Sequence, residues 1–257
     1  MIDSNASNDH AMPMTGAGTR FMIVAQARSG STFLRELLNA QPDITCHGEV
    51  FSRAWIDRLC HRPGQPATSA EDIRALLPAR DADPLAFMAS HVMAFDSAAV
   101  GFKIISEDLI DPRFWDALTG YAQDHGLRVI HLRRLNDLAA LASRKRMGRF
   151  GISHSDRAHH PDQDAQARLV ITGGELKRYR ERQAMLAGRV DAAFPGALQA
   201  RYETLADDFP GILAALGLPG PRPFTAPLRK MAPPDLADLI ENYPELRRFD
   251  RPPQPVW

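Results

Sequence analysis

The segment with the clearest chemical potential is a short run of small polar residues and one arginine, Arg28–Thr32, which reads Arg-Ser-Gly-Ser-Thr. It follows the apolar run Phe21–Ala25, which has the length and composition of a buried parallel strand. Apolar residues after the run recur at helical spacing, so we expect a helix to begin near Ser31. A permissive glycine, hydroxyl groups and a guanidinium at a helix start favour a bound anion, most simply a phosphate. The alternative is a tight strand-to-helix turn without a ligand.

This loop departs from the nucleotide-binding P-loop, G-x-x-x-x-G-K-[ST]. When Gly30 is aligned with the second glycine of that motif, Ala25 stands in place of the first. Ser31 then takes the place of the lysine, and Thr32 takes the last position. The missing lysine is the group that contacts the β- and γ-phosphates, so the loop favours a 5′-phosphate over a triphosphate.

A second candidate anion site follows another apolar run, Arg128–Leu132. Arg133 and Arg134 come directly after this predicted strand, and a predicted helix, Asn136–Met147, carries Ser143 about two turns from its start. Asparagine is a favourable N-cap residue for such a helix. The alternative is that the two arginines only pair with acidic side chains at the end of the strand.

Three ionisable residues stand in or next to further predicted strands. Ile44 and Thr45 suggest a short strand that leaves His47 and Glu49 at its carboxyl end, the edge at which parallel sheets bind ligands. In an extended segment these two residues share a face, so both could line a pocket. Lys103 lies in the apolar run Val100–Ile105, where it either pairs or contacts a ligand, or else reaches solvent from an edge strand.

The remaining pattern alternates strands and helices. We expect helices over Arg53–Cys60, Ser69–Leu77, Pro84–Met93, Asp111–His125, Gly173–Val190 and Asp235–Asn242, a helix ending with Ile212–Leu216, and a strand over Leu198–Tyr202. This alternation predicts an α/β protein with a P-loop-like, three-layer fold, in which a central parallel sheet of about five strands is flanked by helices.

Composition limits the classes of protein that this chain can represent. The 257 residues are 44% hydrophobic and carry 31 basic and 31 acidic side chains, so anion recognition must be local and no nucleic-acid partner is indicated. Residues 1–19 are polar and small and predict a disordered tail, and residues 20–257 predict a single domain. No apolar run is long enough for a membrane span, no signal peptide is evident, and two cysteines suggest packed thiols, so we expect a cytoplasmic protein.

The segment Gly148–Gln166 is rich in histidine, aspartate and glycine and predicts a mobile loop that could act as a lid. His154, His159 and His160 lack the spacing of metal ligands, so no metal site is expected.

Taken in order, four motifs resemble the sulfotransferases that use 3′-phosphoadenosine 5′-phosphosulfate (PAPS). These are R-S-G-S-T after the first strand, G-E after the second, L-R-R-x-N followed by a serine, and R-Y-E-x-L before G-L-P. The resemblance spans about residues 20–245 and is strongest to bacterial carbohydrate sulfotransferases of the trehalose and nodulation-factor type.

The resemblance implies roles for individual residues. The 5′-phosphosulfate would be held by Arg28, Ser29, Gly30, Ser31 and Thr32. Arg134 and Ser143 would bind the 3′-phosphate, together with a C-terminal basic segment that contains Arg229 and Lys230. Glu49 would be the general base, with His47 as a substitute, and Tyr202 and Glu203 would be structural. Arg28 replaces a lysine common in eukaryotic members, which retains electrostatic stabilisation of the leaving group but makes proton donation poor.

Two other functions remain open at this point. A magnesium-dependent kinase of the same fold would need the lysine that Ser31 replaces. A non-catalytic nucleotide-binding or partner-binding module would show no turnover, and an inactive Glu49→Gln variant beside an active parent would argue against it. The sequence does not specify the acceptor beyond a small-molecule or glycan hydroxyl, and it does not specify the oligomeric state.

Overall fold

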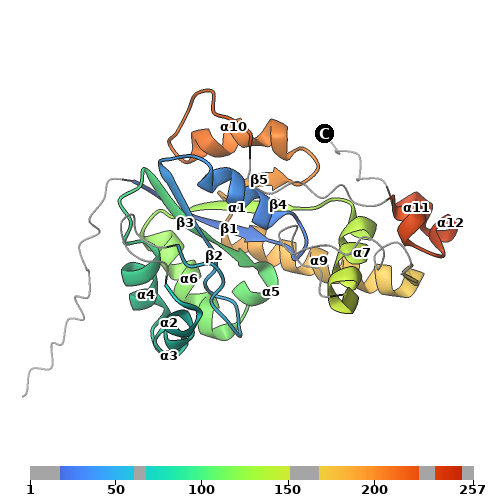
Figure 1. Cartoon of the computed structure of the whole chain (residues 1–257), viewed down its shortest axis with the longest axis horizontal. Helices are drawn as coiled ribbons and strands as arrows, with labels where there is room; N and C mark the ends of the chain where they lie inside the picture. Colours follow the sequence, from blue (N-terminus) through green and yellow to red (C-terminus); the bar gives the residue numbers. More distant parts are fainter. Residues whose placement is uncertain (1–17, 61–67, 151–167, 226–234, 251–257) are drawn as a thin grey trace, which may run out of the picture.

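The computed structural model describes residues 18–60, 68–150, 168–225 and 235–250. Its centre is a parallel sheet with the strand order β2-β3-β1-β4-β5 (Figure 1). The strands are β1 (Thr19–Ala25), β2 (Ile44–Glu49), β3 (Ala99–Ile105), β4 (Arg128–Arg133) and β5 (Leu198–Arg201). The predicted α/β fold with about five parallel strands is therefore confirmed.

Helices cover both faces of the sheet, which explains why the central strand β1 is buried apart from Thr19 and is apolar from Phe21 to Ala25. The helices are α1 (Ser31–Asn39), α2 (Ala70–Ala75), α3 (Leu77–Ala82), α4 (Pro84–Phe87), the π-helix η1 (Met88–Val92), α5 (Ser106–Leu109), α6 (Pro112–Asp124), α7 (Asp137–Phe150), α9 (Gly173–Ala193), α10 (Leu205–Ala215), α11 (Leu236–Leu239), α12 (Tyr243–Leu246) and the 3₁₀-helix η2 (Arg247–Phe249).

Three apolar clusters hold these layers together. On one face, α1 and α10 pack against β1 through residues such as Leu37 and Ile212. On the other face, α4, η1, α6 and the end of α9 surround Phe102 of β3. A third cluster joins α7 and α9 to α11 and α12.

Strand β1 lies between β3 and β4; the chain places β2 and β3 on one side of it and then crosses to place β4 and β5 on the other. Such a reversal of strand order leaves a crevice at the carboxyl ends of the strands, where open α/β sheets bind ligands. The turns after β1 and β4 meet at this place, and these are the two turns that the sequence marks as anion sites.

Two predicted helices differ from the structure. Arg53–Cys60 contains no helix, because its backbone instead pairs with the end of β2: Gly48 N donates to Arg58 O (3.0 Å) and Asp57 N donates to Glu49 O (3.2 Å). The helix predicted over Asp235–Asn242 ends at Leu239, since Ile240 forms a parallel bridge with Leu169.

Other predicted elements appear with shifted ends. Strand β2 continues to Glu49 rather than ending near Thr45, and α7 continues to Phe150. Asn136 caps α7, because its Oδ1 accepts a hydrogen bond from Ala139 N (2.9 Å). The predicted N-terminal tail lies outside the described residues apart from residues 18 and 19, and so does the predicted mobile loop beyond residue 150. The boundary of a single domain stays a prediction.

Candidate active site

The turn between β1 and α1 has the conformation that an anion-binding loop requires. Arg28 (φ 68°) and Gly30 (φ 82°) both adopt left-handed backbone conformations, and Gly30 is the N-cap of α1. No side chain caps the first turn of this helix, which leaves its N–H groups available for an anion. A Cβ atom at Gly30 would overlap the Tyr202 ring, so the residue must be glycine for two separate reasons.

Ser29 adds an unusual feature to the same turn. Its side chain is fully buried, and its hydroxyl has no hydrogen-bond partner among the described residues. Buried polar groups are normally paired, because an unpaired group loses its hydrogen bonds to water without replacement. An anion held in the turn would supply the missing acceptor.

Arg28, Arg134 and Ser143 meet although they come from three different segments. Arg28 Nε donates to Ser143 Oγ (3.0 Å), and Arg134 Nη1 donates to the Arg28 carbonyl oxygen (3.3 Å). Burial lowers the pKa of Arg28, and the nearby positive charge of Arg134 lowers it further. Two guanidinium groups this close repel each other, and a phosphate placed between them would remove the repulsion.

Arg134 is held by contacts that leave part of its guanidinium unused. Its guanidinium lies 4.7 Å from the centre of the Tyr202 ring, and its backbone N–H donates to Gln26 Oε1 (3.3 Å). Its Nε is buried without a partner in the described part of the chain. The alternative that Arg134 only pairs with an acidic side chain finds no such pair among its described contacts.

Tyr202 and Glu203, for which the motif resemblance implies a structural role, support this turn. Glu203 Oε1 accepts hydrogen bonds from the backbone N–H groups of Leu135 and Asn136, both at 3.0 Å. Tyr202 lies between Gly30 and Arg134 and contacts both candidate anion-binding turns. The two turns therefore share one supporting tyrosine.

Glu49 lies at the end of β2 and forms an ion pair inside the sheet. Lys103 Nζ donates to Glu49 Oε1 (2.9 Å) and to Thr32 Oγ1 of α1 (2.9 Å). The Lys103 side chain is 3% exposed, whereas that of Glu49 is 20% exposed. Lys103 therefore does not reach solvent; it connects the carboxylate to the anion-binding turn.

His47 is not beside Glu49, and the prediction that the two residues share a face is wrong. A bulge at Gly48 shifts the register, so that His47 pairs with Phe102 and Glu49 pairs with Lys103. The imidazole therefore faces the cluster around Phe102, away from α1.

Both ring nitrogens of His47 are already engaged. Nε2 lies 2.9 Å from Val92 O, and Nδ1 accepts the N–H of Cys60 (3.0 Å). Burial lowers the pKa of His47 to about 4, so the ring is neutral near pH 7. The structure thus places His47 in the core, whereas Glu49 is linked to Thr32 of α1 through Lys103.

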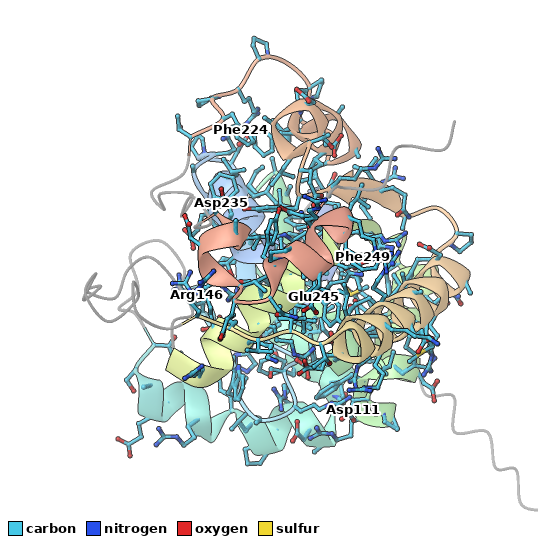
Figure 2. All side chains as sticks on the ribbon, turned by 90° about the vertical axis from the view of Figure 1, so that its right-hand side faces the viewer. Asp111, Arg146, Phe224, Asp235, Glu245 and Phe249 are labelled. Carbon is cyan, nitrogen blue, oxygen red and sulfur yellow. The ribbon has the colours of Figure 1, made fainter. Side chains whose placement is uncertain are left out.

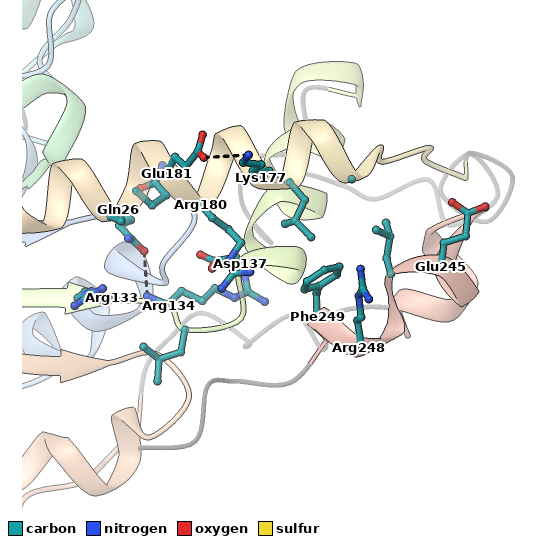
Figure 3. A pocket seen from close by; sticks show the side chains of 16 residues that line it. Gln26, Arg133, Arg134, Asp137, Lys177, Arg180, Glu181, Glu245, Arg248 and Phe249 are labelled. Carbon is teal, nitrogen blue, oxygen red and sulfur yellow. Dashed lines mark hydrogen bonds and ion pairs between the residues drawn. The ribbon is translucent and has the colours of Figure 1, made fainter. Parts of the chain in front are cut away.

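A cavity of about 790 Å³ adjoins Arg134 (Figure 3). It lies between the β4–α7 turn, α9 and η2, at the end of the molecule that Figure 2 shows from the front, where Glu245 and Phe249 are labelled. Its charged lining is partly neutralised by ion pairs between Arg180 and Asp137 (3.2 Å) and between Lys177 and Glu181 (3.8 Å).

Sequence reasoning missed this cavity, although one residue signals it. Gln183 interrupts the otherwise apolar side of α9, is 3% exposed, and has no described partner for either its amide oxygen or its amide nitrogen. The amide lines the cavity together with Arg133 and Phe249. The lining can therefore offer both a donor and an acceptor to a polar ligand.

Several predicted residues are not placed by the structure. Arg229 and Lys230 lie outside the described residues, as do His154, His159 and His160. In the part of the chain that is described, no group of three potential metal ligands comes together, and no helix is long and apolar enough to cross a membrane. Cys46 and Cys60 are free thiols, as predicted.

Comparison with known proteins agrees with the motifs. No family model matches the chain. The chain is 28% identical to nodulation protein H of Rhizobium tropici over 244 residues. This alignment covers 89% of this chain and 88% of that protein. A solved sulfotransferase structure from Alicyclobacillus acidocaldarius aligns with 21% identity and a TM-score of 0.47. The alignment covers 90% of this chain and 89% of the solved chain. The similarity to nodulation protein H over most of both chains supports a bacterial sulfotransferase-like family and a sulfotransferase enzyme.

Proposed function

We propose that this sulfotransferase moves a sulfuryl group from PAPS to a hydroxyl group of a carbohydrate or glycolipid. The observation that carries the proposal is the meeting of two anion-binding turns through Arg28, Ser143 and Arg134. A nucleotide with both a 3′-phosphate and a 5′-phosphosulfate needs two separate anion sites on one sheet edge. A simple nucleoside monophosphate would need only one.

The buried polar atoms fit such a donor. Ser29 Oγ and Arg134 Nε lack described partners at the two turns, and each would gain an acceptor from a phosphate or sulfonate oxygen. The first turn of α1, from Ser31 and Thr32, would hold the 5′ end. Arg134 and Ser143 would hold the 3′-phosphate, and Arg229 and Lys230, outside the described residues, remain candidates for the same role.

In this proposal PAPS supplies an activated sulfuryl group, and the residues of the chain organise its transfer. The acceptor oxygen forms the new S–O bond while the bond from sulfur to the phosphate oxygen breaks, and that oxygen keeps the electron pair. Glu49 accepts the proton of the acceptor hydroxyl, and its partly exposed carboxylate is accessible for this step. Arg28 stabilises the negative charge that develops on the departing phosphate.

The proposed acceptor class and the proposed cellular location rest on different observations. A carbohydrate or glycolipid acceptor is supported by the motif resemblance to carbohydrate sulfotransferases. A cytoplasmic location is supported by the two free thiols, which suit a reducing compartment.

A magnesium-dependent kinase is a weaker candidate. In P-loop enzymes the hydroxyl at the position of Thr32 ligates Mg²⁺. Here that hydroxyl accepts a hydrogen bond from the ammonium group of Lys103 (2.9 Å), and an ammonium group at this place repels a second cation.

Calorimetry tests the proposed donor. Adenosine 3′,5′-bisphosphate should bind the protein in the presence of EDTA, and adenosine 5′-monophosphate should bind more weakly because it lacks the 3′-phosphate. Ser143→Ala should reduce the difference between the two ligands. Binding that requires Mg²⁺, or no binding of the bisphosphate, would contradict the proposal.

Sulfated product detected by mass spectrometry tests the base. Glu49→Gln should lower turnover by about 10²–10⁴-fold, the usual contribution of general acid–base catalysis. Glu175→Gln is the matched control, because Glu175 also pairs with a lysine, Lys145, at 2.7 Å on the surface. Equal turnover of Glu49→Gln and the wild-type protein would exclude Glu49 as the base.

A further inference from the structure

Lys103 has an unusual position for a charged residue. It lies within β3, its side chain is 3% exposed, and its register partner in β1, Ile23, is fully buried. A buried ammonium group is costly unless it has a counter-ion and hydrogen-bond acceptors. Glu49 is the counter-ion, and the Thr32 hydroxyl is the second acceptor.

One of these two partners lies at the proposed donor site, and the other is the proposed base for the acceptor hydroxyl. Thr32 is in the first turn of α1, where the 5′ end of the donor would be held, and Glu49 would receive the acceptor proton. An ammonium group has three donors, and the two contacts use two of them. The ammonium is therefore close enough to the anion-binding turn to interact with a bound anion without leaving its place in the strand.

We propose that Lys103 is a positioning residue that couples the occupancy of the anion-binding turn to the state of Glu49. When the turn is empty, the Glu49 carboxylate is the main counter-ion of Lys103 and is held by it. When an anion binds beside Thr32, it also interacts with the Lys103 ammonium group. The ion pair between Lys103 and Glu49 then weakens, and the carboxylate becomes a better proton acceptor. The base would then act mainly when the donor is in place.

Other charges near Glu49 limit what can be attributed to Lys103. Arg28 from the β1–α1 turn and Asp108 from α5 both interact electrostatically with Glu49. Removal of the Glu49 charge would raise the positive potential of the turn even without any coupling through Lys103. A test must therefore separate this general effect from the specific one.

Thermodynamic reciprocity provides that test. If a bound anion weakens the contact between Lys103 and Glu49, then removal of the Glu49 charge must strengthen anion binding. Calorimetry with adenosine 3′,5′-bisphosphate in EDTA should show that Glu49→Gln binds on the order of fivefold more tightly than the wild-type protein. In a Lys103→Met background, Glu49→Gln should give a clearly smaller increase, because only the general effect of the removed charge remains. Glu175→Gln should leave the affinity unchanged.

The outcomes separate this inference from the proposed function on which it rests. Equal strengthening by Glu49→Gln with and without Lys103 would show a general field effect and overturn the inference alone. An affinity of Glu49→Gln equal to that of the wild-type protein would also overturn it. A wild-type protein that binds no bisphosphate would overturn both proposals.

Two further variants keep the test valid if Lys103→Met does not fold. If Lys103→Met does not fold, as judged by a thermal unfolding transition, Thr32→Val replaces it in the cycle, because it removes the contact to the turn and leaves the ion pair intact. Lys103→Arg should restore part of the coupling, since it keeps a cation between the two partners. A merely structural role of Lys103 predicts altered stability but no change in the effect of Glu49→Gln on affinity.

Discussion

Gly30→Ala should be strongly destabilising, and the structure separates the two causes. The backbone at Gly30 has φ 82°, which costs a residue with a Cβ atom about 1–2 kcal/mol. The new Cβ would also overlap the Tyr202 ring, and the displacement of a packed side chain costs about 1–3 kcal/mol. The sum is about 2–5 kcal/mol of unfolding free energy.

Gly126→Ala is the matched control. Gly126 also has a positive φ (61°), but no atom lies within 4 Å of the position that a Cβ atom would take, so this variant should lose only the backbone part, about 1–2 kcal/mol. Urea unfolding of both variants measures the difference. Gly30→Ala combined with Tyr202→Ala should lose less than the sum of the two single changes, because the overlap is gone.

Binding gives a second measurement on the same variants. Tyr202 also carries the guanidinium of Arg134 at 4.7 Å, so a displaced ring should weaken the binding of adenosine 3′,5′-bisphosphate in Gly30→Ala and leave it unchanged in Gly126→Ala. A Gly30→Ala protein as stable as Gly126→Ala would refute the reasoning about the tyrosine contact.

Three further predictions concern single residues. Glu203→Ala should lose about 2–3 kcal/mol in urea unfolding and weaken bisphosphate binding, because two backbone N–H groups, including that of Leu135, lose a charged acceptor; unchanged stability would contradict this. Burial lowers the pKa of His47 from 6.5 to about 4, so the unfolded chain takes up the proton first and stability should fall by on the order of 2–3 kcal/mol between pH 6.5 and about 4. His47→Gln should flatten this pH dependence, and an equally steep loss in the variant would assign it to other groups. Arg28→Lys should retain most of the bisphosphate affinity but lose about 10²-fold in turnover, since lysine keeps the charge without the fork that reaches Ser143 (3.0 Å); equal losses in affinity and turnover would show that Arg28 only holds the nucleotide.

The fold and the positions of the two candidate anion-binding turns could be predicted from the sequence because they depend on local patterns. A buried parallel strand is a continuous apolar run, and the run Phe21–Ala25 forms the middle of the sheet as β1. The turns that follow β1 and β4 carry their arginines and small residues within a few positions of the strand ends. Parallel strands bring such turns to one edge without any further information.

The segment Arg53–Cys60 shows where local patterns fail. Its composition allows a helix, but its backbone pairs with the end of β2, and that alternative exists only once β2 is in place. Tertiary hydrogen bonds decided its conformation, and the short helix α11 ended early for the same reason.

The sequence by itself determined which residue types form the two candidate anion-binding turns: Arg28 to Thr32 in one turn, and Arg134 with Ser143 in the other. The tertiary structure decided which ionisable groups join them. A one-residue bulge at Gly48 sends His47 into the core and Glu49 toward Lys103, although a regular strand would place both on one face. A bulge depends on how two strands pair, so the spacing of the residues in one strand does not reveal it.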